Sequence, residues 1–121
     1  MSERTEGRHV GEFLVSEGNG SISRETVTIL SGQNLEAGAI LGKVTASGKY
    51  RELNPAGIDG SETAVAILYG NIDASTADTE GVAIVRLAEI NANELVWPDG
   101  ITSPQKATAL GQLAFLDIIA R

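Results

Sequence analysis

The sequence predicts a small, mainly β (α+β) domain with one short C-terminal helix, and three observations carry this prediction. Short segments rich in β-branched and apolar residues recur along most of the chain, and turns of Gly, Pro and Asn separate them. Apolar residues at helical spacing occur in one segment near the C-terminus. The 121 residues fit one domain, and the hydrophobic 42% contains few aromatics, so Val, Ile, Leu and Ala must fill the core.

The N-terminal segment is expected to be a flexible arm. Residues 1–12 are rich in Glu, Arg and Gly and lack apolar periodicity, whereas Phe13, Leu14 and Val15 form a short apolar patch. This patch is either an anchor that docks on another protein or a first strand that packs into its own core, and the sequence favours neither. We therefore divide the chain into an arm at 1–12 and a folded domain at 13–121.

Strands are expected where apolar and β-branched residues alternate or run together. Residues 26–30 alternate, which places Val27 and Ile29 on one face. The longest predicted strand is 82–90. The other predicted strands are 40–45, 49–53, 64–69, 95–97 and 116–119.

Glycine and acidic residues mark the turns between these strands. Gly42 lies inside a predicted strand and marks a bulge or a close backbone approach. Ser47 and Gly48 form a hairpin signal. Residues 71–81 are polar and acidic, so we expect a solvated loop there.

The predicted helix begins close to Pro104. Ser103 is a suitable N-cap, and proline at the first helical position loses no hydrogen bond there. Gly111 lies within the helical pattern, where glycine costs about 1 kcal/mol relative to alanine. The apolar face is predicted to consist of Ala107, Leu110, Leu113 and Ala114.

The composition argues against several classes of function. A net charge of −7 disfavours binding to nucleic acid, because phosphates require Lys and Arg. The absence of cysteine excludes disulfides, thiolate zinc sites and thiol chemistry. The sequence has neither an apolar run of membrane-spanning length nor a signal-peptide pattern. We therefore expect a soluble protein that is made in the cytoplasm without export and does not bind a membrane.

No set of residues supports catalysis, so we do not expect an enzyme or a cofactor. The single histidine, His9, lies in the arm, and no nucleophile–base pair can be assembled around it. The oxygen-rich stretch at 71–80 suggests calcium, but a calcium loop needs Gly at its sixth position and Glu at its twelfth. Those positions hold Thr76 and Val82. An acidic solvated loop explains the stretch better than a metal site does.

Two further residue groups invite an interpretation. Lys49 follows a glycine turn, and small β carrier domains display a modified lysine at such a hairpin tip, so a carrier or ligand-binding β domain is the alternative function. Its neighbours, Gly48 and Tyr50, do not match the usual attachment contexts. Trp97 with Pro98 is interpreted as an anchor of the core or of an interface, because an indole covers a large apolar area.

An ordered series of short sequence segments in the chain resembles the head decoration protein family of tailed bacteriophages, the capsid-cementing proteins related to the lambda decoration protein. The resemblance runs from Phe13 to about Ile119 and is most specific over residues 13–68. It includes the segments 13–20, 23–28, 35–44, 47–50, 54–55, 59–64 and 67–68. Near the C-terminus the matching residues are Val96, Trp97, Pro98, Lys106, Leu116, Ile118 and Ile119.

This resemblance implies a β-clip-like fold and a structural role on the virion. It implies a homotrimer at local three-fold positions of the head that binds the major capsid protein after expansion and braces the shell. The implied location is the outer surface of the capsid. The residues expected to contact the capsid, on the N-terminal arm, are Phe13, Leu14, Val15, Ser16, Ser23 and Arg24. The residues expected at the trimer interface or in the core are Trp97 and Pro98.

Overall fold

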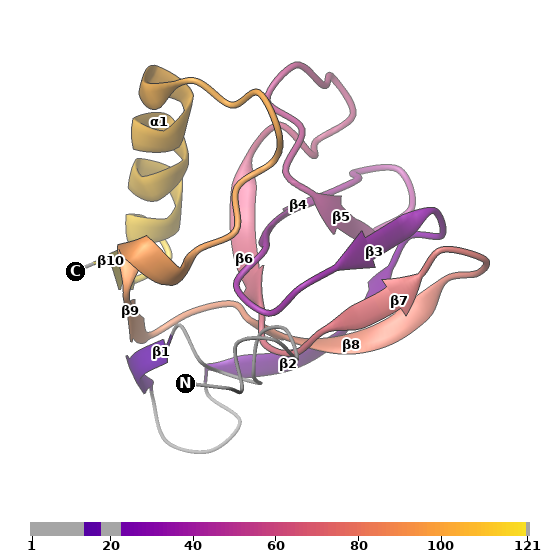
Figure 1. Cartoon of the computed structure of the whole chain (residues 1–121), viewed down its shortest axis with the longest axis horizontal. Helices are drawn as coiled ribbons and strands as arrows, with labels where there is room; N and C mark the ends of the chain where they lie inside the picture. The colour runs from indigo at the N-terminus through magenta and orange to yellow at the C-terminus, as the bar shows by residue number, and fades with distance from the viewer. Residues whose placement is uncertain (1–13, 18–22, 121) are drawn as a thin grey trace, which may run out of the picture.

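The computed structural model describes residues 14–17 and 23–120, and it confirms a mainly β fold with a C-terminal helix (Figure 1). The predicted arm at 1–12, His9 and Phe13 lie outside the described residues. The strands are β1 (Leu14–Glu17), β2 (Arg24–Ile29), β3 (Gln33–Leu35), β4 (Ile40–Lys43), β5 (Tyr50–Glu52), β6 (Ala64–Leu68), β7 (Ile72–Ala74), β8 (Thr79–Ile84), β9 (Ala88–Ile90) and β10 (Ile118–Ala120). The helices are the 3₁₀ turn η3 (Ala92–Glu94) and α1 (Ser103–Ala114).

Five of the strands close into a barrel in the order β2-β5-β4-β6-β8. Its longest pairing is antiparallel, between β2 and β8, from Arg24 opposite Ile84 to Ile29 opposite Thr79. Strands β3 and β7 form a two-stranded ribbon beside the barrel, and β1, β9 and β10 form a separate three-stranded sheet (Figure 1). Closure of the barrel leaves its strands without exposed edges, whereas the three-stranded sheet retains them.

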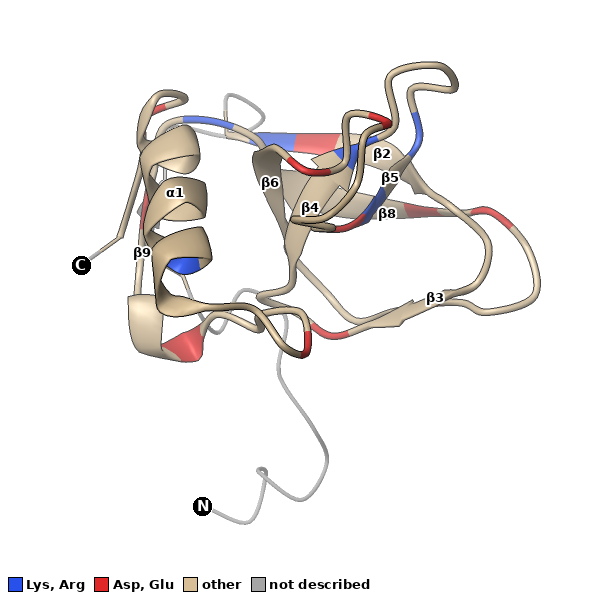
Figure 2. Ribbon diagram, turned by 90° about the horizontal axis from the view of Figure 1, so that it is seen from above, with Lys and Arg blue, Asp and Glu red and all other residues tan. Residues whose placement is uncertain are grey.

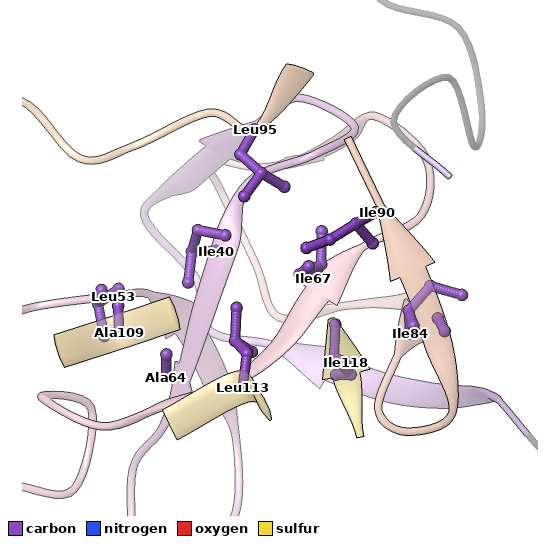
Figure 3. Close-up of a cluster of buried hydrophobic side chains, with 11 residues drawn as sticks. Ile40, Leu53, Ala64, Ile67, Ile84, Ile90, Leu95, Ala109, Leu113 and Ile118 are labelled. Atoms are coloured by element: carbon purple, nitrogen blue, oxygen red, sulfur yellow. The ribbon is translucent and has the colours of Figure 1, made fainter. Parts of the chain in front are cut away.

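Two apolar clusters fill the interior, and the strands β4 and β6 contribute to both. Ile40 and Ile67 belong to the cluster between the barrel, helix α1 and the three-stranded sheet, which Figure 3 shows. Their neighbours Leu41 and Leu68 belong to the second cluster, inside the barrel. Because side chains alternate along a strand, these two strands are buried on both faces. This explains why residues 64–68 form a continuous apolar run.

The glycine predictions are confirmed by the backbone. The pairing of β4 with β6 shifts register between Leu41 and Gly42, and a Cβ on Gly42 would lie 2.2 Å from the carbonyl oxygen of Ser61. Gly48 has φ 73° and its N–H donates to the carbonyl of Val44, which closes the predicted hairpin turn. A positive φ of this kind favours glycine because it has no Cβ.

Helix α1 begins one residue earlier than predicted. Its N-cap is Thr102, not Ser103: Thr102 Oγ1 accepts a hydrogen bond from the N–H of Gln105, and the Gln105 side chain accepts one from the N–H of Thr102. Two donors that would lack partners at the helix start are satisfied in this way. Pro104 is therefore the second helical residue.

The buried face of α1 also differs from the predicted one. Leu113 is fully buried and Leu110 packs beside it, but Ala107 and Ala114 are exposed. Ala109 takes the second buried position, four residues before Leu113. Packing on β6 and β10 sets which face of the helix is buried. The positions of the alanine residues in the sequence do not specify that face.

Three predicted boundaries around β7 to β10 were wrong. The predicted loop at 71–81 contains β7 and the start of β8. The predicted strand at 82–90 breaks at Leu87, whose φ of 54° turns the chain out of the barrel and into the three-stranded sheet. Residues 95–97 form only an isolated bridge between Val96 and Ala39. In each case hydrogen bonding to a distant segment decides the outcome, and local residue preference does not reveal it.

Candidate functional site

The three-stranded sheet brings the first and last strands of the described chain together. Strand β1 pairs antiparallel with β9, with Leu14 opposite Ile90, and β10 pairs parallel with β9, with Ile118 opposite Ala88 (Figure 1). Leu14, Ile90 and Ile118 face the larger apolar cluster. The predicted apolar patch therefore contributes a strand to its own domain. Its next residue, Val15, is 57% exposed and lies at a bulge in the pairing.

Ser16 lies in β1 opposite Glu89, whereas Ser23 and Arg24 lie at the entry to the barrel. Ser23 is fully buried, and its Oγ donates a hydrogen bond of 2.8 Å to the carbonyl of Leu87. The guanidinium of Arg24 lies 4.2 Å from the centre of the Tyr69 ring, a cation–π distance. Ser23 and Arg24 thus hold the start of β2. Among Leu14, Val15, Ser23 and Arg24, the predicted contact residues whose exposure the structure describes, Val15 is the exposed one.

The structure exposes further apolar residues on or next to this sheet. The sequence pattern assigned Leu87 and Ile119 to strands and Phe115 to no element. Leu87 is 43% exposed, Ile119 is 39% exposed, and Phe115 at the end of α1 is 89% exposed. Their periodicity is that of buried strands and a helix end, so no sequence signal distinguishes them. Only the arrangement of β1, β9 and β10 shows that they lie at one end of the molecule.

Trp97 is partly buried and packs against the larger apolar cluster. The main chain before it is held by hydrogen bonds of Val96 with Gly38 and Ile40. The Lys106 ammonium lies over the indole ring, 5.8 Å from its centre. Trp97 and Pro98 are both half-buried, so part of each residue stays accessible.

Acidic residues in β7 and in the turn after it accept hydrogen bonds that hold the local chain. Asp73 accepts hydrogen bonds from the N–H and the hydroxyl of Ser75, whereas Asp78 accepts one from Ser31 and pairs with Lys49 at 2.5 Å. Hydrogen bonds from Lys49 and then from Ser31 lower the pKa of Asp78 below its usual value. Among the described residues, no group of three or more His, Asp or Glu side chains is placed to hold a metal ion.

Lys49 is the residue on which the alternative function, a carrier or ligand-binding β domain, depends. Its ammonium pairs with Asp78, its side chain is 38% exposed, and it lies directly after the hairpin turn at Gly48. The open cleft beside α1 is lined by Leu53, Pro55, Glu62, Pro104, Gln105, Thr108, Ala109 and Gln112. No helix in the described ranges is long and apolar enough to cross a membrane.

Comparison with known proteins decides the family. No curated protein matches the chain significantly. The model of the family described as bacteriophage lambda head decoration protein D matches residues 4–118, nearly the whole chain. Proteins of this family decorate and stabilise the phage capsid from its outer surface, and they are structural, not catalytic. The chain therefore belongs to the bacteriophage lambda head decoration protein D family.

Proposed function

We propose that this protein cements the phage head as a homotrimer that sits at local three-fold positions of the major capsid protein lattice and engages it through β1 and the arm before it. The observation that carries the proposal is that the strand after the arm lies at the edge of a sheet. Strand β1 is hydrogen-bonded to β9 on one side, and in the sheet order its other side faces no further strand of the described chain. In this proposal the chain consists of the arm at 1–12 and the head decoration domain at 13–121.

An edge strand of this kind supports attachment by strand addition. Main-chain N–H and C=O groups on the open edge of β1 can pair with an extended segment of the capsid protein, and flanking side chains add specificity. Phe13, Leu14, Val15 and Ser16 make up this contact segment. Ser23 and Arg24, which are held by Leu87 and Tyr69, fix the chain that follows it.

Three-fold symmetry makes such a weak contact durable. Ordering an arm costs on the order of 1–2 kcal/mol per residue, so a single arm would bind weakly. Three arms on one trimer raise the effective concentration to roughly millimolar, and the avidity can exceed the affinity of one arm by about 10²–10⁴. The accessible parts of Trp97 and Pro98 are the proposed contribution to the contact between subunits.

The experiment measures binding of the full chain to expanded shells of the major capsid protein from the phage that encodes it. Val15→Asp adds a charge beside the β1 edge at an exposed position, so we expect reduced binding with an unchanged unfolding midpoint. Thr76→Asp adds the same charge in the acidic turn and serves as the matched control. Equal binding by Val15→Asp and the wild type would contradict the β1 contact.

Two further measurements test the assembly. Deletion of residues 2–12 leaves β1 in place, so the domain should stay folded while shell binding weakens. Light scattering of the free protein and cryo-microscopy of decorated shells report the oligomer and its position. Density confined to two-fold or five-fold positions would overturn the three-fold placement.

A further inference from the structure

The sequence contains two Asp-Gly pairs, and the fold holds them in opposite ways. An aspartate before glycine can rearrange without an enzyme, because glycine has no side chain to shield its main-chain nitrogen from the preceding carboxyl group. The pairs are Asp59–Gly60, in the loop between β5 and β6, and Asp99–Gly100, in the turn between η3 and α1. Both aspartates are exposed, so the surroundings of each pair decide whether it reacts.

The carboxylate of the first pair is fixed in place. Oδ1 of Asp59 accepts hydrogen bonds from the N–H and the hydroxyl of Ser61, at 3.1 Å and 2.5 Å, and Ser61 is fully buried. These hydrogen bonds lower the pKa of Asp59, so less of its carboxyl group is protonated. Attack by nitrogen requires the protonated form, because that form can release its oxygen as water.

The nitrogen of the first pair is fixed as well. The N–H of Gly60 donates a hydrogen bond of 2.9 Å to Oε1 of Glu62. The φ of Gly60 is 105°, and a Cβ there would lie 2.2 Å from Oγ1 of Thr45 and 2.6 Å from the carbonyl oxygen of Lys43. The main chain is therefore packed against the end of β4 and the residues after it. Attack on Asp59 would require this nitrogen to leave Glu62 and the chain to move away from these contacts.

The second pair has neither restraint. Asp99 and Gly100 are the two middle residues of a turn that one hydrogen bond closes, from the N–H of Ile101 to the carbonyl of Pro98 at 3.3 Å. Gly100 has φ 79°, and a Cβ there would meet no atom within 4 Å. The Gly100 N–H and the Asp99 carboxylate make no hydrogen bond among the residues that the structure describes. Figure 2 shows an acidic segment on the loop that leads into α1.

We propose that Asp99–Gly100 is a site of spontaneous isomerisation to isoaspartate, whereas the hydrogen bonds and packing of Asp59–Gly60 protect that pair. The reaction needs only the chain itself and water. It therefore goes beyond the proposed function and does not depend on the capsid contact.

The reaction has two steps and no net change in mass. The main-chain nitrogen of Gly100 forms a bond to Cγ of Asp99, the bond from Cγ to its hydroxyl oxygen breaks, and the hydroxyl leaves as water with the proton of the N–H. Water then opens the resulting succinimide. Addition at Cγ restores aspartate. Addition at the main-chain carbonyl breaks its bond to nitrogen, so the chain continues through Cγ and the former carbonyl becomes a free carboxylate.

The product lengthens the main chain between two segments that are held in place. Isoaspartate adds one carbon atom to the path of the chain. Trp97 before the turn and Ile101 after it both pack against the larger apolar cluster, and Thr102 caps α1. The turn at 98–101 must therefore absorb the added length.

The test incubates the folded full chain in warm, mildly acidic buffer and follows two tryptic peptides. Cleavage after Arg51, Arg86 and Lys106 gives residues 52–86, which contain Asp59, and residues 87–106, which contain Asp99. Electron-transfer dissociation locates isoaspartate by its main-chain fragments, and the succinimide is detected by the loss of one water. We expect isoaspartate to form at least about tenfold faster at Asp99 than at Asp59, a ratio that corresponds to about 1.4 kcal/mol in the activation barrier.

Two controls separate the effect of the fold from that of the local sequence. In denaturant both pairs lose their surroundings, so the two aspartates should react at similar rates. Asp99→Glu keeps the charge but would have to form a six-membered ring, so this position should stay unmodified. Asp99→Asn and Asp59→Asn form a matched pair, because loss of ammonia is read as a gain in mass. The Asp99→Asn variant should deamidate faster by a similar ratio.

Three results would overturn the proposal. Equal rates at the two aspartates in the folded protein would show that the restraints on Asp59 do not protect it. Isoaspartate that forms at Asp99 only in denaturant would show that the turn at 98–101 is itself protective. A difference in rate that persists unchanged in denaturant would assign the selectivity to neighbouring residues in the sequence and not to the fold.

Discussion

Replacing Gly42 with alanine is expected to destabilise the protein strongly, although only a methyl group is added. A Cβ at this position would lie 2.2 Å from the carbonyl oxygen of Ser61 and 2.7 Å from its carbonyl carbon. Ordinary van der Waals contact begins at 3.4 Å, so the two backbone segments would have to separate by about 1 Å. Both segments are buried, and neither can move into solvent.

The magnitude follows from the contacts that this separation disturbs. Overpacking of a buried site costs about 1–3 kcal/mol. The carbonyl of Ser61 also accepts a hydrogen bond from the N–H of Asn54 at 2.9 Å, whose loss costs about 0.5–1.5 kcal/mol. We therefore expect Gly42→Ala to lose about 2–4 kcal/mol, which lowers the thermal midpoint by roughly 8–16 °C in a domain of this size.

Gly111→Ala is the matched control, because the same methyl group would meet no atom within 4 Å in α1. Alanine is the better helix former, so this variant should gain about 0.5–1 kcal/mol. Thermal unfolding followed by circular dichroism measures both at one protein concentration, since self-association makes the midpoint concentration-dependent. Midpoints that shift equally, or a Gly42→Ala midpoint within about 2 °C of the wild type, would refute the close-approach reasoning.

Three further outcomes are expected. Thr102→Ala should lose about 1 kcal/mol in denaturant unfolding because the N-cap of α1 is removed, while Thr102→Ser should retain most of it. Trp97→Ala should cost about 2–3 kcal/mol, below the value for a fully buried tryptophan, and the native emission of Trp97 should indicate a partly exposed indole; a fully exposed spectrum would refute its packing on the core. Asp78→Asn should reduce stability at pH 7, and this reduction should shrink as the pH falls below about 4: hydrogen bonds from Lys49 and Ser31 lower the pKa of Asp78, so its contribution is present above the usual carboxyl value and is lost progressively as the pH falls through the lowered value. A difference between wild type and Asp78→Asn that persists unchanged at pH 3 would contradict this assignment.

Local residue patterns determined much of the fold. The alternation around Val27 and Ile29, both buried, correctly placed β2, and the continuous apolar run correctly placed β6. The bulge at Gly42 and the hairpin turn at Gly48 were predicted because glycine alone tolerates such backbone positions. The family resemblance also came from the sequence, because the order of the turn segments and apolar segments can be compared without a structure.

The candidate site was only partly predictable. Three of the residues expected to contact the capsid differ in exposure: Val15 is exposed, Leu14 is half-buried against the core, and Ser23 is fully buried with its hydroxyl bound to the carbonyl of Leu87. Contact of any of them with the capsid stays a prediction. The apolar patch at 13–15 was compatible with a docking segment and with a strand of its own domain. Three residues are too few to show a periodicity that distinguishes the two. Only pairing with β9, more than seventy positions along the chain, places residues 14–17 in a strand of their own domain.

The tertiary structure alone decided which apolar residues face outward. By itself the sequence determined a mainly β domain with a C-terminal helix, a cysteine-free acidic surface and membership of a capsid-decorating family. Leu87 and Ile119 lie in segments whose composition is that of buried strands, and Phe115 ends an amphipathic helix. Their exposure depends on the break between β8 and β9 and on parallel pairing of β9 with β10, both of which are long-range hydrogen-bonding choices. Residue preference is a local property, and the direction of a side chain in a sheet depends on its distant partners.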